Sequence, residues 1–308
     1  MMRSPWRIAT AVRHPDGSIL VKAFPFISLS KRHRWIALPV VRGVVGLYEA
    51  LRIGIQSLNW SAEIASEAEE IKPATGWGRL VNVLIMLVAF AMGIGLFMAV
   101  PYALAGIPSF STNQVYFHLL AGCIRILLLI GYMGAISLLP EINQVFRYHG
   151  SEHKSIFAFE KKLQLTIENA LSQSRFHPRC GTSFLLLAAI LTMLGFMLID
   201  SFLVHLLGSY KGVIHRILIH LPLLPLVAGV SYEALRLIER HSDKPAWHPL
   251  VLPGFLLQRI TTREPSGEQL EVALAALQES LIKEEQSYLG SPRSLPEESY
   301  LDSIRKVG

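Results

Sequence analysis

The sequence predicts a mainly α-helical, polytopic membrane protein with about four transmembrane helices, a small N-terminal β-hairpin and cytoplasmic amphipathic helices. Composition is the first observation: of 308 residues, 51% are hydrophobic and 17% charged, with a mean hydropathy of +0.40. A soluble domain usually has about 25% charged residues. Distribution is the second: charge is absent from Leu80 to Ile124 and sparse from Gly181 to Leu221. The apolar residues are therefore gathered into segments of membrane-spanning length.

Four apolar segments are the candidates for the spans, and they cover residues 80–107, 115–139, 183–207 and 213–235. A helix needs about 20 residues to cross the hydrocarbon core, and the first three segments meet that length. Pro222 and Pro225 interrupt the fourth, which we expect to be kinked or partly unwound. A three-span alternative would leave the basic C-terminal tail outside the cell, so four spans are favoured.

The distribution of lysine and arginine orients these spans. Eleven lysine and arginine residues lie in 1–79, six lie in 140–182 and nine lie in 233–308. In contrast, residues 108–114 contain no lysine or arginine, and residues 208–212 contain one. The positive-inside rule then places both termini and residues 140–182 on the cytoplasmic side of the cell (inner) membrane. The net charge of +6 has the same explanation. We expect the bilayer as the main partner, other copies of the chain or other membrane proteins as further partners, and no nucleic acid.

This orientation divides the chain into five parts. They are a cytoplasmic N-terminal region (1–79), a first transmembrane pair (80–139), a cytoplasmic loop (140–182), a second transmembrane pair (183–235) and a cytoplasmic C-terminal region (236–308). The N-terminus has no apolar core of the signal-peptide type, so no cleaved signal is expected. The two cysteines, Cys123 and Cys180, fall in a span and in a polar loop, which argues against a disulfide framework.

Three flanking stretches have regular patterns. Polar and apolar residues alternate on both sides of Pro15-Asp16-Gly17, which predicts a strand–turn–strand unit. Residues 40–60 have helical apolar spacing, typical either of an amphipathic helix on the membrane or of a buried soluble helix. Residues 266–285 begin with Ser-Gly-Glu and predict a regular amphipathic helix, and the last twenty residues predict a loose tail.

The loop between the second and third spans contains His149, Glu152 and His153. On a helix, the i, i+4 spacing puts both histidines on one face with Cβ atoms about 5–6 Å apart, so both imidazoles could bind one metal. The order H-x-x-E-H matches a metalloprotease pattern in which the glutamate is the general base. Gly150 weakens the helix at this place, by about 1 kcal/mol relative to alanine.

A second polar cluster, His177 and Cys180, lies just before the third span. Imidazole and thiolate are natural zinc ligands, so His149, His153, His177 and Cys180 form a candidate ligand set. If all four bind, the site is closed and structural; if three bind, a water position opens and Glu152 could act as the base. The alternative is a histidine-rich surface loop that binds no metal, with Glu141, Glu160 and Glu168 as solvated charges.

The second and the third predicted spans each contain a charged residue, Arg125 and Asp200. A buried Arg costs at least about 2.5–3.5 kcal/mol on insertion scales, so it should face the bundle and find a partner. We predict an Arg125–Asp200 ion pair that fixes helix register, and a transport or proton path is the alternative. Four histidines toward the outer side of the membrane are interpreted as interfacial or packing residues: His118, His205, His215 and His220.

Several blocks resemble the bacterial YqhQ-like membrane proteins, a domain-of-unknown-function family described as predicted metal-dependent enzymes. They include "AVRHPDG", "RGVVGLYEAL", "FRYHGSEHK", "HPRCGTSFL", "AGVSYEALRL" and "PGFLLQRITTREPSGEQLEVALAAL". The resemblance extends to about residue 280. It supplies no known reaction but strengthens the metal hypothesis, and the positions that match its characteristic blocks are His149, Glu152, His153, His177, Arg179 and Cys180. The sequence departs from the family pattern at its start, where a Gly-rich segment ending in glutamate is expected before the first methionine.

Three functions follow from these observations. The first is a metal-dependent hydrolase of the membrane, in which the histidines with His177 or Cys180 hold Zn²⁺ and Glu152 activates water. The second is a non-enzymatic membrane scaffold or assembly factor whose His/Cys site fastens the loop. The third is an oligomeric transporter or channel, suggested by Arg125, Asp200 and the proline-broken fourth span.

Overall fold

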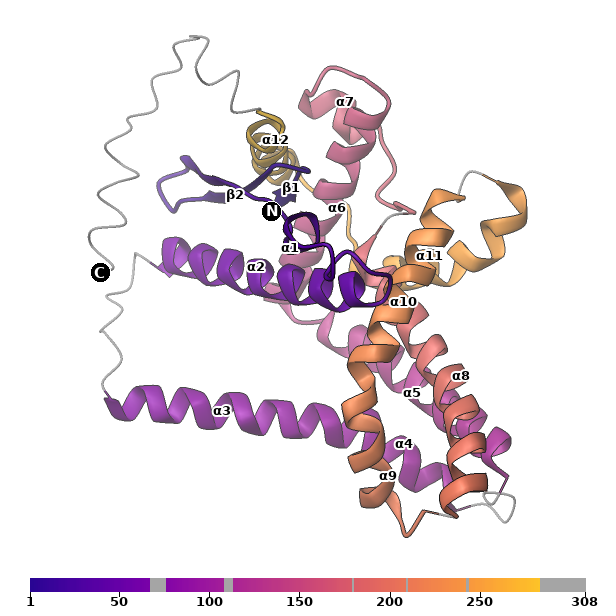
Figure 1. The fold of residues 1–308 in the computed structure, drawn as a ribbon. Coiled ribbons are helices and arrows are strands. Elements are labelled where there is room, and N and C mark those ends of the chain that lie inside the picture. Colours follow the sequence, from indigo (N-terminus) through magenta and orange to yellow (C-terminus); the bar gives the residue numbers. More distant parts are fainter. Residues whose placement is uncertain (67–75, 108–112, 179, 209, 242–243, 283–308) are drawn as a thin grey trace.

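The computed structural model describes residues 1–66, 76–107, 113–178, 180–208, 210–241 and 244–282. The fold is mainly helical, with a small three-stranded sheet near the N-terminus (Figure 1). Four helical segments are long and apolar enough to cross a membrane: Val83–Ala105, Gln114–Ile136, Leu185–Leu206 and Val213–Ile238. The predicted fold class and the four predicted spans are therefore confirmed, the fourth included.

The central bundle is built from α5 (Gln114–Ile136), α8 (Gly181–Leu207) and the fourth span (Figure 1). Helices α5 and α8 approach so closely that a Cβ on Gly122 would lie under 3.0 Å from the side chain of Met193. In a membrane, where lipid is as apolar as leucine, small residues at helix crossings stabilise packing by letting backbones meet. Gly122 is such a residue.

The first span consists of α3 (Gly76–Ile94), a π-helical turn (η1, Gly95–Ala99) and α4 (Val100–Ala105). Pro101 has no amide hydrogen, so the carbonyl of Phe97 four residues earlier loses its normal helical donor. Arg125 of α5 supplies a replacement: its Nε donates to that carbonyl at 2.8 Å. The side chain also lies against the ring of Tyr102, with Cζ 5.5 Å from the centroid.

The fourth span has a break where the sequence predicted one. Helix α9 (Val213–His220) passes through a 3₁₀ turn (η2, Leu221–Leu223) into α10 (Leu224–Arg240). Pro222 lies in this turn, and the tighter hydrogen bonding accommodates its missing amide hydrogen. The span remains one candidate crossing, Val213–Ile238.

The N-terminal region folds as an antiparallel sheet in the order β1 (Met2–Arg3), β2 (Arg7–Arg13), β3 (Ile19–Pro25). The predicted hairpin is present, with Gly17 at φ +90° in its turn, and β1 adds a strand that the pattern did not predict. Both faces of β2 are covered. The Oγ1 of Thr10 contacts the Oγ of Ser57 on α2 at 2.9 Å, and Ala11 on the opposite face packs against α12.

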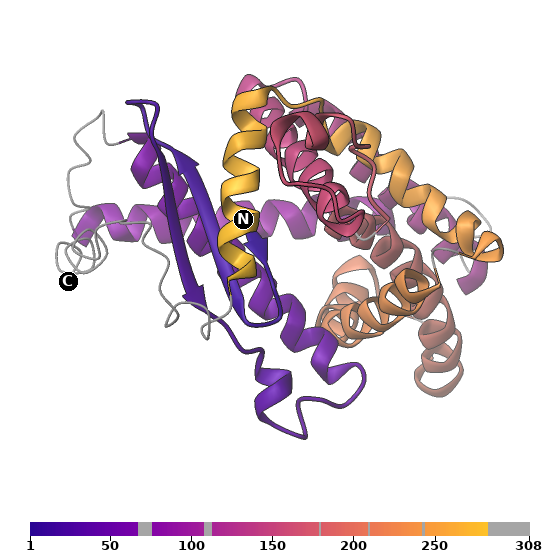
Figure 2. The same ribbon diagram turned by 90° about the horizontal axis from the view of Figure 1, so that it is seen from above.

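Helix α2 (Val41–Ser66) connects the sheet to the bundle, after the short α1 (Leu29–Arg32) (Figure 2). It crosses α10 at two glycines, Gly43 and Gly229, and Arg42 forms a two-point ion pair with Glu233. The structure thus gives α2 a packed inner face, as in the buried-helix alternative. Its other face leaves apolar side chains exposed: Tyr48, Leu51, Ile55 and Leu58.

Residues 140–182 form helices that extend the bundle beyond the apolar segments. Helix α6 (Pro140–Glu160) follows α5, and α7 (Ile167–Leu171) returns toward α8. The C-terminal part contributes η3 (Pro245–Trp247), α11 (His248–Thr261) and α12 (Gly267–Leu281), which packs on α6 and on the sheet. The predicted start of α12 is confirmed by a capping box between Ser266 and Gln269; the tail from residue 283 lies outside the described residues.

Candidate metal centre

Two histidines one helical turn apart form the base of the site. His149 and His153 lie on α6 with ring centroids 4.4 Å apart, as their i, i+4 spacing predicted. His153 is 7% exposed and His149 is half-buried. Their imidazoles therefore face the protein interior at the end of the bundle.

Each ring is held by a backbone carbonyl through its Nδ1. Nδ1 of His149 donates to the carbonyl of Thr261 at 2.8 Å, and Nδ1 of His153 donates to the carbonyl of Arg175 at 2.6 Å. A carbonyl oxygen can only accept, so Nδ1 must carry hydrogen in both rings. In the neutral rings this leaves the lone pair on Nε2. Metal-binding histidines are typically oriented by a hydrogen bond of this kind.

Cys180 completes the cluster. Its Sγ lies 3.3 Å from Nε2 of His149, and one ligand atom from each of His149, His153 and Cys180 lies within 4.8 Å of the others. Cys180 is the N-cap of α8, where the backbone N–H of Thr182 donates to Sγ at 3.4 Å. The hydroxyl of Thr182 also lies 3.0 Å from this sulfur. The structure thus places a 3%-exposed thiol opposite two imidazoles.

The electrostatics of the cluster favour a thiolate. Burial of Cys180 opposes ionisation, but hydrogen bonds from His149 and His153 and their positive charge outweigh it and lower the pKa to about 5. Burial also opposes protonation of His149. The hydrogen bond and negative charge of Cys180, with the charge of Glu152, outweigh that burial and raise the His149 pKa. Both shifts therefore favour a thiolate on Cys180 beside a protonated His149 over the neutral pair.

A close backbone contact at Gly150 brings Thr261 to His149. A Cβ on Gly150 would lie under 3.0 Å from the carbonyl oxygen of Arg263, so only glycine leaves room for the segment that follows α11. The N–H of Arg263 also donates to the carbonyl of Phe146 at 2.9 Å. Gly150 appeared in the sequence only as a helix-weakening residue. Its absent side chain is what lets α6 and the end of α11 meet.

Residue Gln258 of α11 holds the segment before Cys180. Its side-chain amide accepts from the backbone N–H of His177 and donates to the carbonyl of the same residue, both at 2.8 Å. Gln258 is fully buried. This clamp, together with Thr261, means that α11 positions both halves of the cluster. Neither residue was a sequence candidate, although both lie in a block that carries the family resemblance.

The remaining predicted site residues are placed differently. His177 is buried, and its Nε2 lies 3.3 Å from a carboxylate oxygen of Glu160. Among the described residues, the group that could hold a metal consists of His149, His153 and Cys180 and does not include His177. Glu152 accepts a hydrogen bond from the amino group of Met1 at 2.6 Å. Arg179 lies outside the described residues. Both cysteines are free thiols.

The predicted intramembrane ion pair has a different cation. Asp200 is fully buried and pairs with Arg216 of α9 at 3.0 Å rather than with Arg125. It also contacts His118 at 2.7 Å and His220 at 2.6 Å, and Tyr210 donates to it at 2.5 Å. Two of the histidines assigned to packing are therefore carboxylate partners.

Arg125 and Asp200 lie at different depths in the bundle, which explains why the predicted ion pair does not form. Arg125 lies eleven residues from the start of α5, about 16 Å, whereas Asp200 lies seven residues from the end of α8, about 10 Å. Arg125 is thus about one turn too deep and binds the Phe97 carbonyl instead.

Comparison with known proteins identifies the family of the chain. Residues 38–283 match the family model "Protein of unknown function (DUF1385)". The chain belongs to this family. A relative from Bacillus subtilis (strain 168), the "Uncharacterized protein YqhQ", is 34% identical over 288 residues, which cover 88% of this chain and 86% of that protein. The family match includes all three cluster residues of this DUF1385 protein, and the resemblance to YqhQ-like proteins is confirmed. No solved structure matches the chain.

Proposed function

We propose that this protein is a membrane-embedded, zinc-dependent hydrolase whose metal is held by His149, His153 and Cys180. One observation supports it most: two carbonyls hold the Nδ1 atoms, so both Nε2 atoms are available beside a buried thiol of low pKa. Two nitrogens and one thiolate are a typical donor set for Zn²⁺. Three protein ligands leave a fourth position for water, as catalytic zinc sites do.

The chemistry at that position is water activation. Zinc bound to three protein ligands lowers the pKa of its water to about 7, which supplies a nucleophile at neutral pH. Glu152 is the carboxylate between the two histidines in sequence, and its charge contributes to the raised pKa of His149. We assign it to accept the proton of the attacking water and to pass it to the leaving group. The two carbonyl-bound histidines stay in place as ligands.

The metal assignment is tested by elemental analysis of the purified full chain. We expect about one zinc per chain in the wild type and its loss in His149→Ala, His153→Ala and Cys180→Ser. His177→Ala and Cys123→Ser are the matched controls, one for each ligand type, and should keep the zinc. Equal zinc in Cys180→Ser and wild type would reject the ligand set. Loss in His177→Ala would instead indicate a closed, four-ligand site.

The catalytic part is tested separately with Glu152→Gln. This change keeps the shape of the side chain and removes the base, so we expect zinc content to stay and hydrolysis of ester substrates to fall by about 10²–10⁴-fold. Zinc that stays bound while no ester or peptide is hydrolysed would contradict a hydrolase.

A structural site is the second candidate, and the number of segments joined by the cluster favours it. His149 and His153 on α6, Cys180 at the start of α8 and the carbonyls of Thr261 and Arg175 come from four parts of the chain. A metal there would fasten them together in a membrane scaffold. In that case a chelator would lower the unfolding temperature strongly, and Glu152→Gln would have no effect on any activity.

A further inference from the structure

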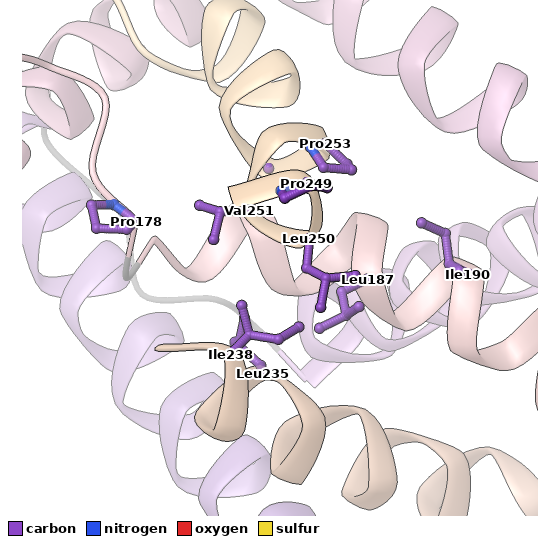
Figure 3. A pocket seen from close by; sticks show the side chains of 10 residues that line it. Pro178, Leu187, Ile190, Leu235, Ile238, Pro249, Leu250, Val251 and Pro253 are labelled. Carbon is purple, nitrogen blue, oxygen red and sulfur yellow. The ribbon is translucent and has the colours of Figure 1, made fainter. Parts of the chain in front are cut away.

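An apolar pocket lies between α8, α10 and α11, at the end of the bundle that carries the His/Cys cluster (Figure 3). Its volume is about 110 Å³. Figure 3 shows side chains from the three helices gathered around it, all of them hydrocarbon apart from the proline ring nitrogens. The walls include Leu187, Ile190, Leu235, Ile238, Val251 and Pro253.

The pocket lies at the depth of the apolar spans. Leu187 and Ile190 are in the first turns of the candidate span Leu185–Leu206, and Leu235 and Ile238 are in the last turn of Val213–Ile238. Helix α11 forms one wall of the pocket, and two leucines of this helix that do not line the pocket are exposed: Leu252 and Leu256. At that depth the surrounding solvent is lipid, so hydrocarbon chains are the molecules present at highest concentration.

The pocket also adjoins the candidate metal centre through two shared elements. Pro178, which lines it, is two residues from Cys180, and Leu187 is seven residues from Cys180 along α8, about 10 Å at the helical rise. Helix α11 lines the pocket with Val251 and Gly254 and reaches the cluster with Thr261. A molecule with an apolar tail in the pocket would thus hold its polar end near the cluster.

Positively charged residues lie on the elements around the pocket, at the same end of the bundle as the His/Cys cluster. Arg236 lies on α10 between the pocket residues Leu235 and Ile238, Arg240 ends this helix, Lys244 precedes α11, and Arg259 lies on α11. Lysine and arginine just beyond an apolar span attract anionic lipid headgroups, by about 1 kcal/mol each near the surface. The apolar pocket and the basic residues of the elements that flank it together match the polarity of an anionic phospholipid.

We propose that this pocket binds the acyl chain of an anionic membrane phospholipid, and that its acyl ester is the bond presented to the candidate metal centre. The substrate assignment rests on the proposed hydrolase; the binding of the chain does not. In the reaction, water adds its hydroxyl to the acyl carbon while the bond to the glycerol oxygen breaks. A fatty acid is released, and the proton goes to the glycerol oxygen. No oxidant or reductant is needed.

Binding is tested with phosphatidylglycerol that carries a photoactivatable group on its acyl chain, incorporated with the purified full chain into phosphatidylethanolamine vesicles. We expect crosslinks on α8, α10 and α11 at the pocket. Val251→Trp fills the pocket and should reduce these crosslinks by about tenfold, the loss expected when two methylenes cannot be buried. Leu256→Trp introduces the same side chain on the exposed side of α11 and should leave the number of crosslinks unchanged.

Zinc content separates this inference from the proposed function. Val251→Trp should lose lipid crosslinks and keep zinc, which also shows that it folds, while Cys180→Ser should lose zinc and keep the crosslinks. If Val251→Trp does not retain zinc, Ile190→Phe is the second blocking variant. Crosslinks unchanged in a zinc-containing blocking variant would overturn the proposal, as would co-purification of an apolar peptide in the pocket.

Activity then tests the substrate assignment. If the protein hydrolyses esters, Val251→Trp should reduce kcat/KM for the phospholipid about tenfold and leave that for a short-chain, water-soluble ester unchanged. An equal loss for both esters would reject the pocket as the tail site. Lipid binding with no hydrolysis in the wild type would retain the pocket and reject the proposed reaction.

Discussion

At the scale of single residues, two backbone carbonyls determine the chemistry of the cluster. The carbonyls of Thr261 and Arg175 hold the Nδ1 atoms of His149 and His153, so both rings turn Nε2 toward Cys180. No pattern of residue types could predict these two hydrogen bonds, because every residue has a backbone carbonyl and the sequence does not show which of them lies beside a given histidine. The i, i+4 spacing predicted that the histidines share a face, and it could predict no more.

Cys180 is expected to be a thiolate in the metal-free protein. Its pKa of about 5 lies well below the value of about 8.5 for a free thiol, so it stays ionised as the pH falls from neutrality to about 5. The lowered pKa of Cys180 contributes stability that is fully present above the pKa of the unfolded thiol and is lost as the pH falls through about 5.

The measurement is the ultraviolet absorbance of the thiolate in chelator-treated Cys123→Ser protein, titrated with acid. A single step near pH 5 that is missing in the Cys123→Ser, Cys180→Ser double variant is the expected result. A step near pH 8.5 would show that the imidazoles do not stabilise the anion.

Gly150 is expected to tolerate no side chain. Gly150→Ala should raise helix propensity, yet its Cβ would lie under 3.0 Å from the carbonyl oxygen of Arg263, and backbone cannot move aside cheaply. We expect a net destabilisation of about 1–3 kcal/mol and reduced zinc content. Gly134→Ala is the control, because a Cβ there meets nothing within 4 Å. Thermal unfolding in detergent compares them, and a Gly150→Ala protein as stable as wild type would contradict the close contact.

At the scale of elements, glycines mark where helices cross. The sequence predicted the four spans, the hairpin and the start of α12, because hydropathy and turn residues are local signals. It did not predict that α2 packs on α10, since that contact depends on Gly43 and Gly229, which lie far apart in the chain. The Arg125–Asp200 pairing failed for a related reason: partners in a bundle are set by depth and rotation, which span boundaries alone leave undetermined.

The crossing of α2 and α10 gives an element-scale prediction. In Gly229→Ala, the added Cβ would lie under 3.0 Å from the carbonyl oxygen of Val40, so the two helices must separate. We expect faster hydrogen exchange across α2 and the sheet, with little change in α5 and α8. Gly46→Ala, whose Cβ would make an ordinary 3.7 Å contact with Tyr232, should exchange like wild type. Unchanged exchange in Gly229→Ala would show that the crossing does not hold the N-terminal region.

At the scale of the whole molecule, the fold separates two polar clusters toward opposite ends of the bundle. The His/Cys cluster adjoins the start of α8, and the Asp200 cluster lies near the end of the same helix. A small cavity of about 190 Å³ lined by Tyr102, Tyr210 and Arg216 adjoins the second cluster. Because the basic segments are concentrated at the His/Cys end, the positive-inside rule predicts that the proposed metal centre faces the cytoplasm and that the Asp200 cluster lies toward the outer side.

That orientation can be tested with single cysteines at the two ends of the bundle. Both variants are made in a Cys123→Ser, Cys180→Ser background. Ile107→Cys places a thiol just after α4, where the native side chain is 76% exposed. Leu138→Cys places one in the connection between α5 and α6, where the native side chain is 81% exposed. A membrane-impermeant maleimide added to intact cells should label Ile107→Cys and reach Leu138→Cys only after permeabilisation. The positive-inside rule requires this result, because the segment after Leu138 carries six basic residues while residues 108–114 carry none. The reverse labelling would invert the bundle, and the water, substrate and lipid leaflet available to the His/Cys cluster would then be those of the outer face.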